Sequence, residues 1–225
     1  MERPDQLIDI VRQVALWSLP ILAAVIFHEV AHGAVALRLG DDTALRVGRL
    51  TLNPLPHIDP IGTLLMPSLL MLAGLPVFGY ARPVPVDYGR LHNPRRDMMA
   101  VALAGPGTNL ALALVSAGLF HILKGQLAGL TSETASSFHL GVVLPLAQMA
   151  QASVVINVSL AIFNLLPLPP LDGGRVLTGL LPYAQARVVA AIEPFGFLIL
   201  AALIMTGWLR FLVSAPISYV TRMLL

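Results

Sequence analysis

The chain has 225 residues, of which 56% are hydrophobic and 12% charged, and its formal net charge is +2. An average soluble domain is about 25% charged, so a water-soluble protein this apolar would lack the polar groups to cover its surface, and we expect lipid to be its solvent. The small net charge indicates no nucleic-acid partner, and the absence of cysteine excludes disulfides and thiolate metal ligands.

The chain begins with a polar stretch, residues 1–13, that has no basic segment followed by a small-residue cleavage site, so we predict no cleaved signal peptide. Four apolar stretches then approach the ~20 residues that a membrane-spanning helix needs. They are Val14–Leu39, Met98–Leu123, Gly141–Leu166 and Val188–Leu209. We therefore predict an all-α polytopic membrane protein with about four to six transmembrane helices, in a single domain over residues 1–225.

Two shorter features separate the first two apolar stretches. Apolar and polar residues partly alternate in Thr43–Pro54, which predicts a short strand or β-hairpin near the membrane surface. Residues 61–80 are apolar but contain the helix breakers Gly62, Pro67, Gly74, Pro76 and Gly79. This density of breakers predicts a re-entrant segment, with a full membrane span as the alternative.

The distribution of arginine favours the re-entrant alternative. If 61–80 returns to the side that it left, all seven arginines from Arg38 to Arg96 lie on one side of the membrane, and the next loop, around Lys124–His139, carries a single Lys. That arrangement follows the positive-inside rule, whereas a full span would divide the arginines between both sides. We therefore expect an integral protein of a prokaryotic plasma membrane, with its Arg-rich loops in the cytoplasm.

The first apolar stretch contains the motif His28-Glu29-Val30-Ala31-His32. Residues four apart share one face of a helix, so His28 and His32 can present two imidazoles to one metal ion, for which zinc is the best fit. Glu29, beside the first ligand, can act as a general base toward water. Three ionisable residues in an apolar helix are costly in lipid, which favours a functional site over mere hydrogen bonding in the bundle core.

A catalytic zinc site needs a third protein ligand and an open position. The other histidines lie in predicted loops or at predicted helix ends: His57, His92, His121 and His139. A stronger candidate is Asp172, which follows an apolar helix broken by three prolines within residues 167–170 and precedes two glycines that allow close backbone approach. An ordinary aspartate in a loop is the alternative for this residue.

Together these motifs resemble the site-2 protease family of intramembrane zinc metalloproteases, peptidase family M50. The His-Glu-x-x-His motif is followed by Asn-x-x-Pro-x-x-x-Leu-Asp-Gly at residues 164–173, and Ala104–Asn109 between them resembles the Gly-x-x-x-Asn element of the family. The resemblance covers Val14–Leu180 and implies one zinc ion per chain, held by His28, His32 and Asp172, with Glu29 as the catalytic base. It also implies, more weakly, that Asn164 and Asn109 position the substrate or organise the core. For Gly105–Asn109, helix packing alone is an equal alternative.

Residues 52–63 resemble the region after the first motif in compact family members that lack a PDZ domain. Here His57 and Asp59 could approach the metal as an inhibitory ligand or shape the substrate entrance, and an ordinary surface turn is the favoured alternative. The chain shows neither a PDZ-like segment nor a cystathionine-synthase-type tail, so these two means of substrate selection or nucleotide sensing are not expected.

The predicted function is zinc-dependent hydrolysis of peptide bonds in membrane-spanning protein segments, as in regulated intramembrane proteolysis. Its partners are then a membrane-protein or membrane-peptide substrate and the lipid bilayer, with no particular oligomeric state indicated. The strand at Thr43–Leu52 could hold an extended substrate by edge addition, and 61–80 could be a gate. The alternatives are a catalytically silent metal-binding regulator or chaperone, and a zinc transporter. Glu29 favours the enzyme, because metal binding alone needs no base.

Overall fold

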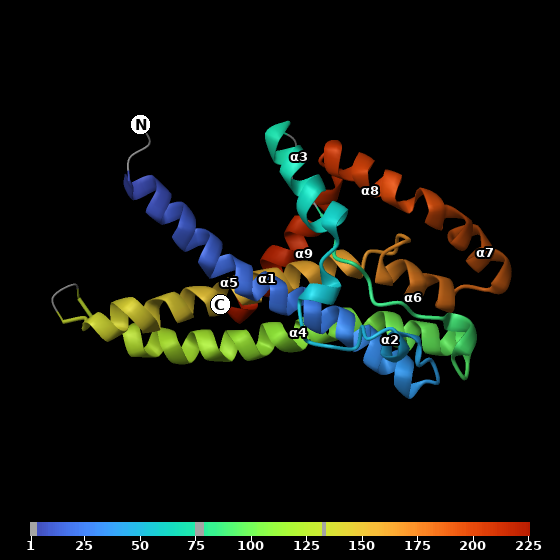
Figure 1. Cartoon of the computed structure of the whole chain (residues 1–225), viewed down its shortest axis with the longest axis horizontal. Coiled ribbons are helices and arrows are strands. Elements are labelled where there is room, and N and C mark those ends of the chain that lie inside the picture. Colours follow the sequence, from blue (N-terminus) through green and yellow to red (C-terminus); the bar gives the residue numbers. More distant parts are fainter. Residues whose placement is uncertain (1–3, 75–78, 132–133) are drawn as a thin grey trace.

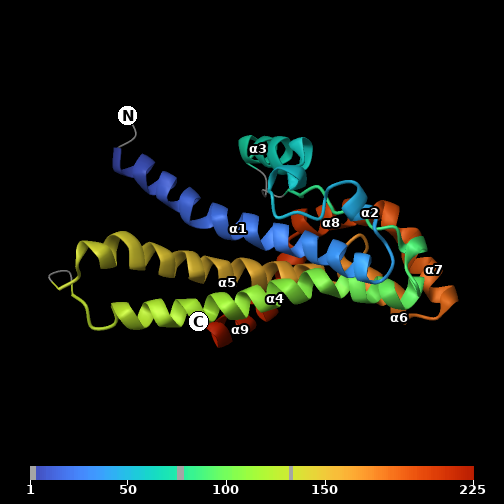
Figure 2. The ribbon, with the colours of Figure 1, turned by 60° about the horizontal axis from the view of Figure 1, so that its bottom comes forward.

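The structure is a computed structural model that describes residues 4–74, 79–131 and 134–225. Three long helices form its centre: α1 (Pro4–Arg38), α4 (Pro94–Leu127) and α5 (Leu144–Asn164). They lie side by side in both views of the ribbon, with the N-terminal part of α1 diverging from the other two (Figures 1 and 2). The largest interface joins α4 to α5, and α1 packs on both.

The contacts between these helices use small side chains. Ala113 and Ala117 of α4 are buried against Val154 and Val158 of α5. In a bilayer, lipid tails are as apolar as leucine, so helices associate through close packing, which small residues permit. This explains why the buried core of so apolar a chain is poor in large side chains.

Four further helices follow α5. They are α6 (Asp172–Leu180), α7 (Tyr183–Ile192), α8 (Gly196–Met205) and α9 (Trp208–Leu224). A 3₁₀ turn at Glu193–Phe195 joins α7 to α8, and the two form an apolar rod that stands apart from the three central helices (Figure 1). The chain then returns, so that α9 packs on α5.

Four helical stretches of the described residues are long and apolar enough to cross a membrane. They are Val11–Arg38, Pro94–Leu127, His139–Asn164 and Tyr183–Met205. The third begins with a π-helical turn, His139–Val143, that leads into α5. The first three stretches predicted from the sequence are thus confirmed as helices, whereas the fourth ends at Met205 and not at Leu209. Over the described residues, the protein is an all-helical integral membrane protein. No separate helix is predicted from the sequence at α9, which carries Arg210 and Arg222.

The predicted β-hairpin at Thr43–Pro54 is wrong. Thr43–Arg46 forms a single helical turn, α2, and no strand occurs in the described parts of the chain. The cause is local hydrogen bonding: the Asp41 carboxylate accepts bonds from the Thr43 amide and hydroxyl, which start a turn in place of a strand. Burial alone would raise the pKa of Asp41, but these bonds and one from the Asp87 amide outweigh it and lower the pKa below its ordinary value.

The structure does not support the predicted re-entrant segment either. The described part of 61–80 begins as a helix, with a π-helical turn at Pro60–Leu65 that continues into α3 (Met66–Leu72), while residues 75–78 lie outside the described part. Asp59 caps this helix and Pro60 occupies its first position, where a missing N–H costs nothing. Two of the predicted breakers, Gly62 and Pro67, therefore lie within helical turns.

Candidate metal centre

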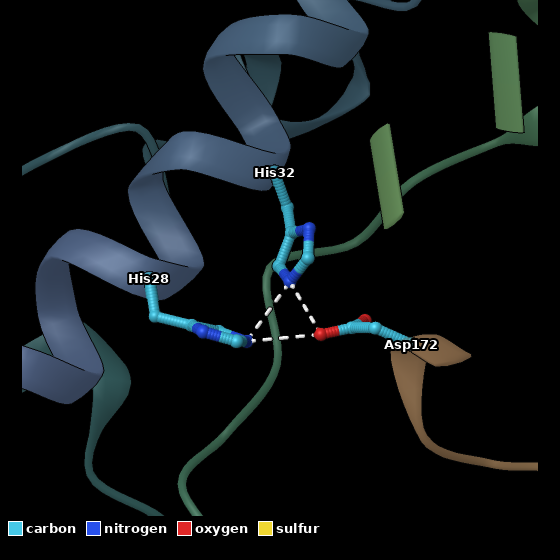
Figure 3. Close-up of side chains that lie close together, drawn as sticks. All are labelled: His28, His32 and Asp172. Carbon is cyan, nitrogen blue, oxygen red and sulfur yellow. Dashed lines mark hydrogen bonds and ion pairs between the residues drawn. The ribbon is translucent and has the colours of Figure 1, made fainter. Parts of the chain in front are cut away.

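Three buried side chains meet beside α1. His28 and His32 lie one turn apart on this helix, and Asp172 is the first residue of α6 (Figure 3). The Nε2 atoms of the two imidazoles are 3.0 Å apart, and Asp172 Oδ2 lies 3.2 Å from His28 Nε2 and 3.3 Å from His32 Nε2. Within the described residues, these three form the group that could hold a metal ion.

The other nitrogen of each imidazole is hydrogen-bonded, and this indicates where the protons lie. His28 Nδ1 is 2.6 Å from Asn109 Oδ1, and His32 Nδ1 is 2.7 Å from the carbonyl oxygen of Val101. Both partners are acceptors, so each Nδ1 donates its N–H, and each Nε2 of the neutral ring keeps a lone pair. Two lone pairs and a carboxylate oxygen therefore face one another, an arrangement that a bound cation stabilises.

The spacing of these three atoms fits zinc. Zn–N and Zn–O bonds of about 2.0–2.2 Å in a tetrahedron separate neighbouring ligand atoms by about 3.3–3.6 Å, and the observed separations of 3.0 to 3.3 Å come up to the short end of this range. Asp172 Oδ2 is buried and accepts no hydrogen bond from the described residues, so a metal ion would satisfy an otherwise unpaired oxygen. Two imidazoles and one carboxylate are also a donor set of catalytic zinc sites, with a fourth position left open.

The turn between α5 and α6, residues 165–171, places Asp172. Three prolines in this turn end α5, and α6 then begins at Asp172 itself. A Cβ on Gly173 would overlap the carbonyl group of Leu165, and one on Gly174 would lie 2.6 Å from a carbonyl carbon of the same turn. Both glycines are therefore needed for α6 to start directly against the turn and present its first side chain to α1.

On its other side, the centre is closed by Gly105 of α4. A Cβ at this position would lie 2.6 Å from His28 Nε2 and would overlap His32 Nε2. The two imidazoles thus pack directly against the backbone of α4. Helix packing and a functional role are equal alternatives for Gly105 from the sequence, and in the structure Gly105 contacts the site itself.

Asn109, on the same helix, is fully buried and orients His28. Its Nδ2 donates to the carbonyl oxygen of Ala24 (3.1 Å) and to Asn157 Oδ1 (2.8 Å), which leaves Oδ1 as the acceptor for the imidazole. Of the two roles expected for Asn109, positioning the substrate or organising the core, these contacts favour the second.

Glu29 lies half-buried on α1 beside His28. Its Oε2 atom accepts a hydrogen bond of 2.7 Å from the backbone N–H of Val84, a residue in the loop before α4. Glu29 does not belong to the group of three potential ligands. The site therefore offers one carboxylate, Asp172, that can bind a metal ion and a second, Glu29, that can exchange a proton.

The remaining sequence candidates lie outside the three-residue group. Asn164 Nδ2 donates to the Leu160 carbonyl of its own helix (3.0 Å). His57 is 3% exposed, and its Nε2 donates to the carbonyl oxygen of Thr51 (2.9 Å). Asp59 accepts bonds of 2.9 and 2.7 Å from two amides in the first turn of the following helix. Neither His57 nor Asp59 belongs to the group that could hold a metal ion, as an inhibitory ligand would have to.

The model of peptidase family M50 matches residues 16–206. The chain belongs to peptidase family M50. YwhC of Bacillus subtilis, a proposed zinc metalloprotease, is 39% identical to it over 186 residues, which are 83% of this chain and 78% of YwhC. Rip2 of Mycolicibacterium smegmatis, also a proposed zinc metalloprotease, is 32% identical over 82% of this chain and 64% of Rip2. Rip2 of Mycobacterium tuberculosis H37Rv is 31% identical over 83% of this chain and 67% of its own. No solved structure matches the chain.

Membership in family M50 confirms the resemblance drawn from the three sequence motifs. Three contacts of this M50 chain are nevertheless not predicted from its sequence: the Val84 amide on Glu29, the Val101 carbonyl on His32, and Asn157 on Asn109. Of these contacts, only the one made by Asn157 could have been suspected from the sequence, since a buried amide in a membrane-spanning stretch usually has a specific partner. The other two are backbone groups, which leave no mark in the sequence.

Asn109→Ala should lower the zinc affinity of this M50 peptidase by about 10- to 100-fold, the usual cost of losing a hydrogen bond that orients a ligating imidazole. The affinity is measured by competition with a chelator on detergent-purified protein. Asn164→Ala is the matched control, because the Asn164 amide bonds only within its own helix among the described residues, and it should keep the wild-type affinity. Equal affinities of both variants would contradict the orienting role of Asn109.

Proposed function

We propose that this M50 peptidase is an intramembrane zinc endopeptidase that hydrolyses peptide bonds in membrane-spanning protein segments. The observation that carries the proposal is the triangle of ligand atoms from His28, His32 and Asp172, and the two histidines lie on a helix long enough to span a membrane. The names of the bacterial relatives, proposed zinc metalloproteases, support zinc as the metal. Because α1, α4 and α6 all contribute to the site, we also propose one membrane-embedded domain over residues 1–225.

Within this proposal the side chains divide the chemistry between them. His28, His32 and Asp172 hold zinc, which when bound supplies a Lewis acid for the scissile carbonyl group and for water. Glu29 takes a proton from the attacking water and passes it to the leaving amine. The carboxylate is suited to this because it lies beside the ligands without being one of them.

We place the substrate in an apolar pocket of about 200 Å³ that opens beside α1. Val25, one turn before Glu29, lines one wall, and His57, Thr63 and Tyr80 line the other. The walls are almost entirely apolar, so the pocket suits an apolar side chain from a membrane-spanning segment. This position supports the predicted role of His57 at the substrate entrance, whereas the substrate-binding edge strand is excluded together with the β-hairpin.

We further propose that the Arg-rich loops are cytoplasmic. The backbone N–H of His92, just before α4, donates to the carbonyl oxygen of Leu39, just after α1 (2.9 Å). The end of α1, at Arg38, and the beginning of α4, with Arg95 and Arg96, are therefore on the same side of the molecule. This supports the positive-inside arrangement expected from the sequence.

Metal content tests the proposed function. Detergent-purified wild type should carry about one zinc ion per chain, and Asp172→Asn should lose most of it on dialysis against a chelator, because a neutral amide is a poor substitute for the carboxylate. Asp59→Asn is the matched control, since it makes the same change in a carboxylate that caps a helix, and it should keep its zinc. A wild type that binds no zinc even after reconstitution would rule out the proposed function. Retention of zinc by Asp172→Asn would assign the third ligand to another residue.

A further inference from the structure

Residues 80–86 pass beside α1 without forming a helix, and they contain Pro83 and Pro85 on either side of Val84. Proline fixes its own φ near about −65° and disfavours the helical conformation for the residue before it. Arg82 and Val84 each precede a proline, so both are held in an extended conformation. Because proline has no N–H, Val84 carries the single amide donor of this Pro-Val-Pro sequence.

Hydrogen bonds hold this stretch in place on both sides of Val84. The backbone N–H of Arg82 donates to the carbonyl oxygen of His57 (2.9 Å), and that of Asp87 donates to the Asp41 carboxylate (2.8 Å). The Val84 side chain between them is only 6% exposed. Its backbone therefore has little freedom to shift along α1.

The Val84 N–H points at Glu29 and donates to its Oε2 atom at 2.7 Å, a charge-assisted bond. Gly33, one turn after Glu29 on the same face of α1, makes this approach possible, since a Cβ there would lie 2.9 Å from Val84 Cγ1. The other carboxylate oxygen, Oε1, receives no hydrogen bond from the residues that the structure describes. The two oxygens of Glu29 are thus held differently.

We propose that the backbone amide of Val84 is a positioning group for the general base, holding Oε2 so that Oε1 is left to take the proton from water. This inference rests on the proposed function, which assigns that proton transfer to Glu29. A free glutamate side chain samples many rotamers, and fixing one of its oxygens before the reaction removes that freedom in advance. The expected gain is large, because a misplacement of about 1 Å can cost about 100-fold in rate.

Replacing the Val84 amide with an ester, by incorporating the α-hydroxy acid analogue of valine, removes this N–H and leaves the side chain unchanged. We expect kcat to fall by about 10- to 100-fold, with KM and zinc content unchanged. The probe is a quenched-fluorescent apolar peptide chosen from a library for cleavage by wild type. The same replacement at Val86, whose amide makes no hydrogen bond to the described residues, is the matched control and should keep the wild-type kcat.

The outcomes separate this inference from the proposed function. A Val84 ester with wild-type kcat, beside a Glu29→Gln variant that is inactive and loaded with zinc, would refute the positioning role and leave the proposed function intact. A Val84 ester that loses its zinc would also refute it, because the contact would then serve the metal centre. An active Glu29→Gln variant would overturn the proposed function, and the inference with it.

A double-mutant cycle tests the same contact by ordinary mutagenesis. Gly33→Ala should lower kcat, because the added methyl group presses on Val84 Cγ1. Val84→Ala removes that atom and keeps the amide, so Gly33→Ala should cost less in the Val84→Ala background. Equal costs in both backgrounds would mean that Gly33 acts through its other neighbours, Leu50 and Ala44 at 3.1 and 3.2 Å, and would count against the inference.

Discussion

Glu29→Gln should leave zinc in place and lower the rate of peptide hydrolysis by about 10²- to 10⁴-fold, the usual contribution of a general base. Glutamine has nearly the shape of glutamate, and its carbonyl oxygen can accept the Val84 N–H that Glu29 Oε2 now accepts. The three candidate ligands are untouched, so the metal site stays assembled. Since an amide does not take a proton from water at neutral pH, the step that is lost is the proton transfer.

The measurement is kcat for the same quenched-fluorescent apolar peptide, with zinc content determined on the same samples. Glu193→Gln is the matched control: it makes the same chemical change in a half-exposed carboxylate that lies 3.5 Å from Arg175, and it should keep the wild-type rate. A Glu29→Gln rate within about tenfold of wild type would assign water activation to another group. If wild type binds zinc and cleaves no peptide of the library, the silent metal-binding regulator becomes the better interpretation.

The histidine pair could be predicted from the sequence because its geometry is local. A spacing of four residues on a helix of 3.6 residues per turn places His28 and His32 on one face whatever the rest of the chain does. Asp172 could also be predicted as a candidate ligand, because three prolines before it and two glycines after it require a sharp turn at that point. What the sequence does not contain is the distance between these elements, which depends on the packing of α1, α4 and α6.

The contacts that hold the site could not be predicted, for the same physical reason. The Val84 amide and Glu29 are 55 residues apart in the chain, and the donor is a backbone group that any residue except proline would offer. The wrong β-hairpin has a different cause. A short alternating pattern predicts a strand only when a partner strand exists, and here the Asp41 carboxylate accepts the nearby Thr43 amide and hydroxyl instead.

Gly105→Ala should give a folded protein that binds no zinc and hydrolyses no peptide. The added Cβ would lie 2.6 Å from His28 Nε2 and would overlap His32 Nε2, so either the imidazoles or the whole of α4 must move. Metal–ligand distances tolerate about ±0.2 Å, which is less than either movement requires. The helix itself should not suffer, since alanine is favoured over glycine in a helix interior by about 1 kcal/mol.

Gly107→Ala, two residues along α4, is the matched control, because a Cβ there meets no atom within 4 Å. It should keep its zinc and its activity, with a Tm equal to or slightly above that of wild type. Zinc content and Tm are measured for both variants with and without a chelator. If Gly105→Ala loses zinc while its Tm in the chelator matches that of wild type, Gly105 serves the metal site. If its Tm falls under the same conditions, close packing of α1 on α4 is its main role. Wild-type zinc affinity in Gly105→Ala would contradict the placement of the imidazoles against α4.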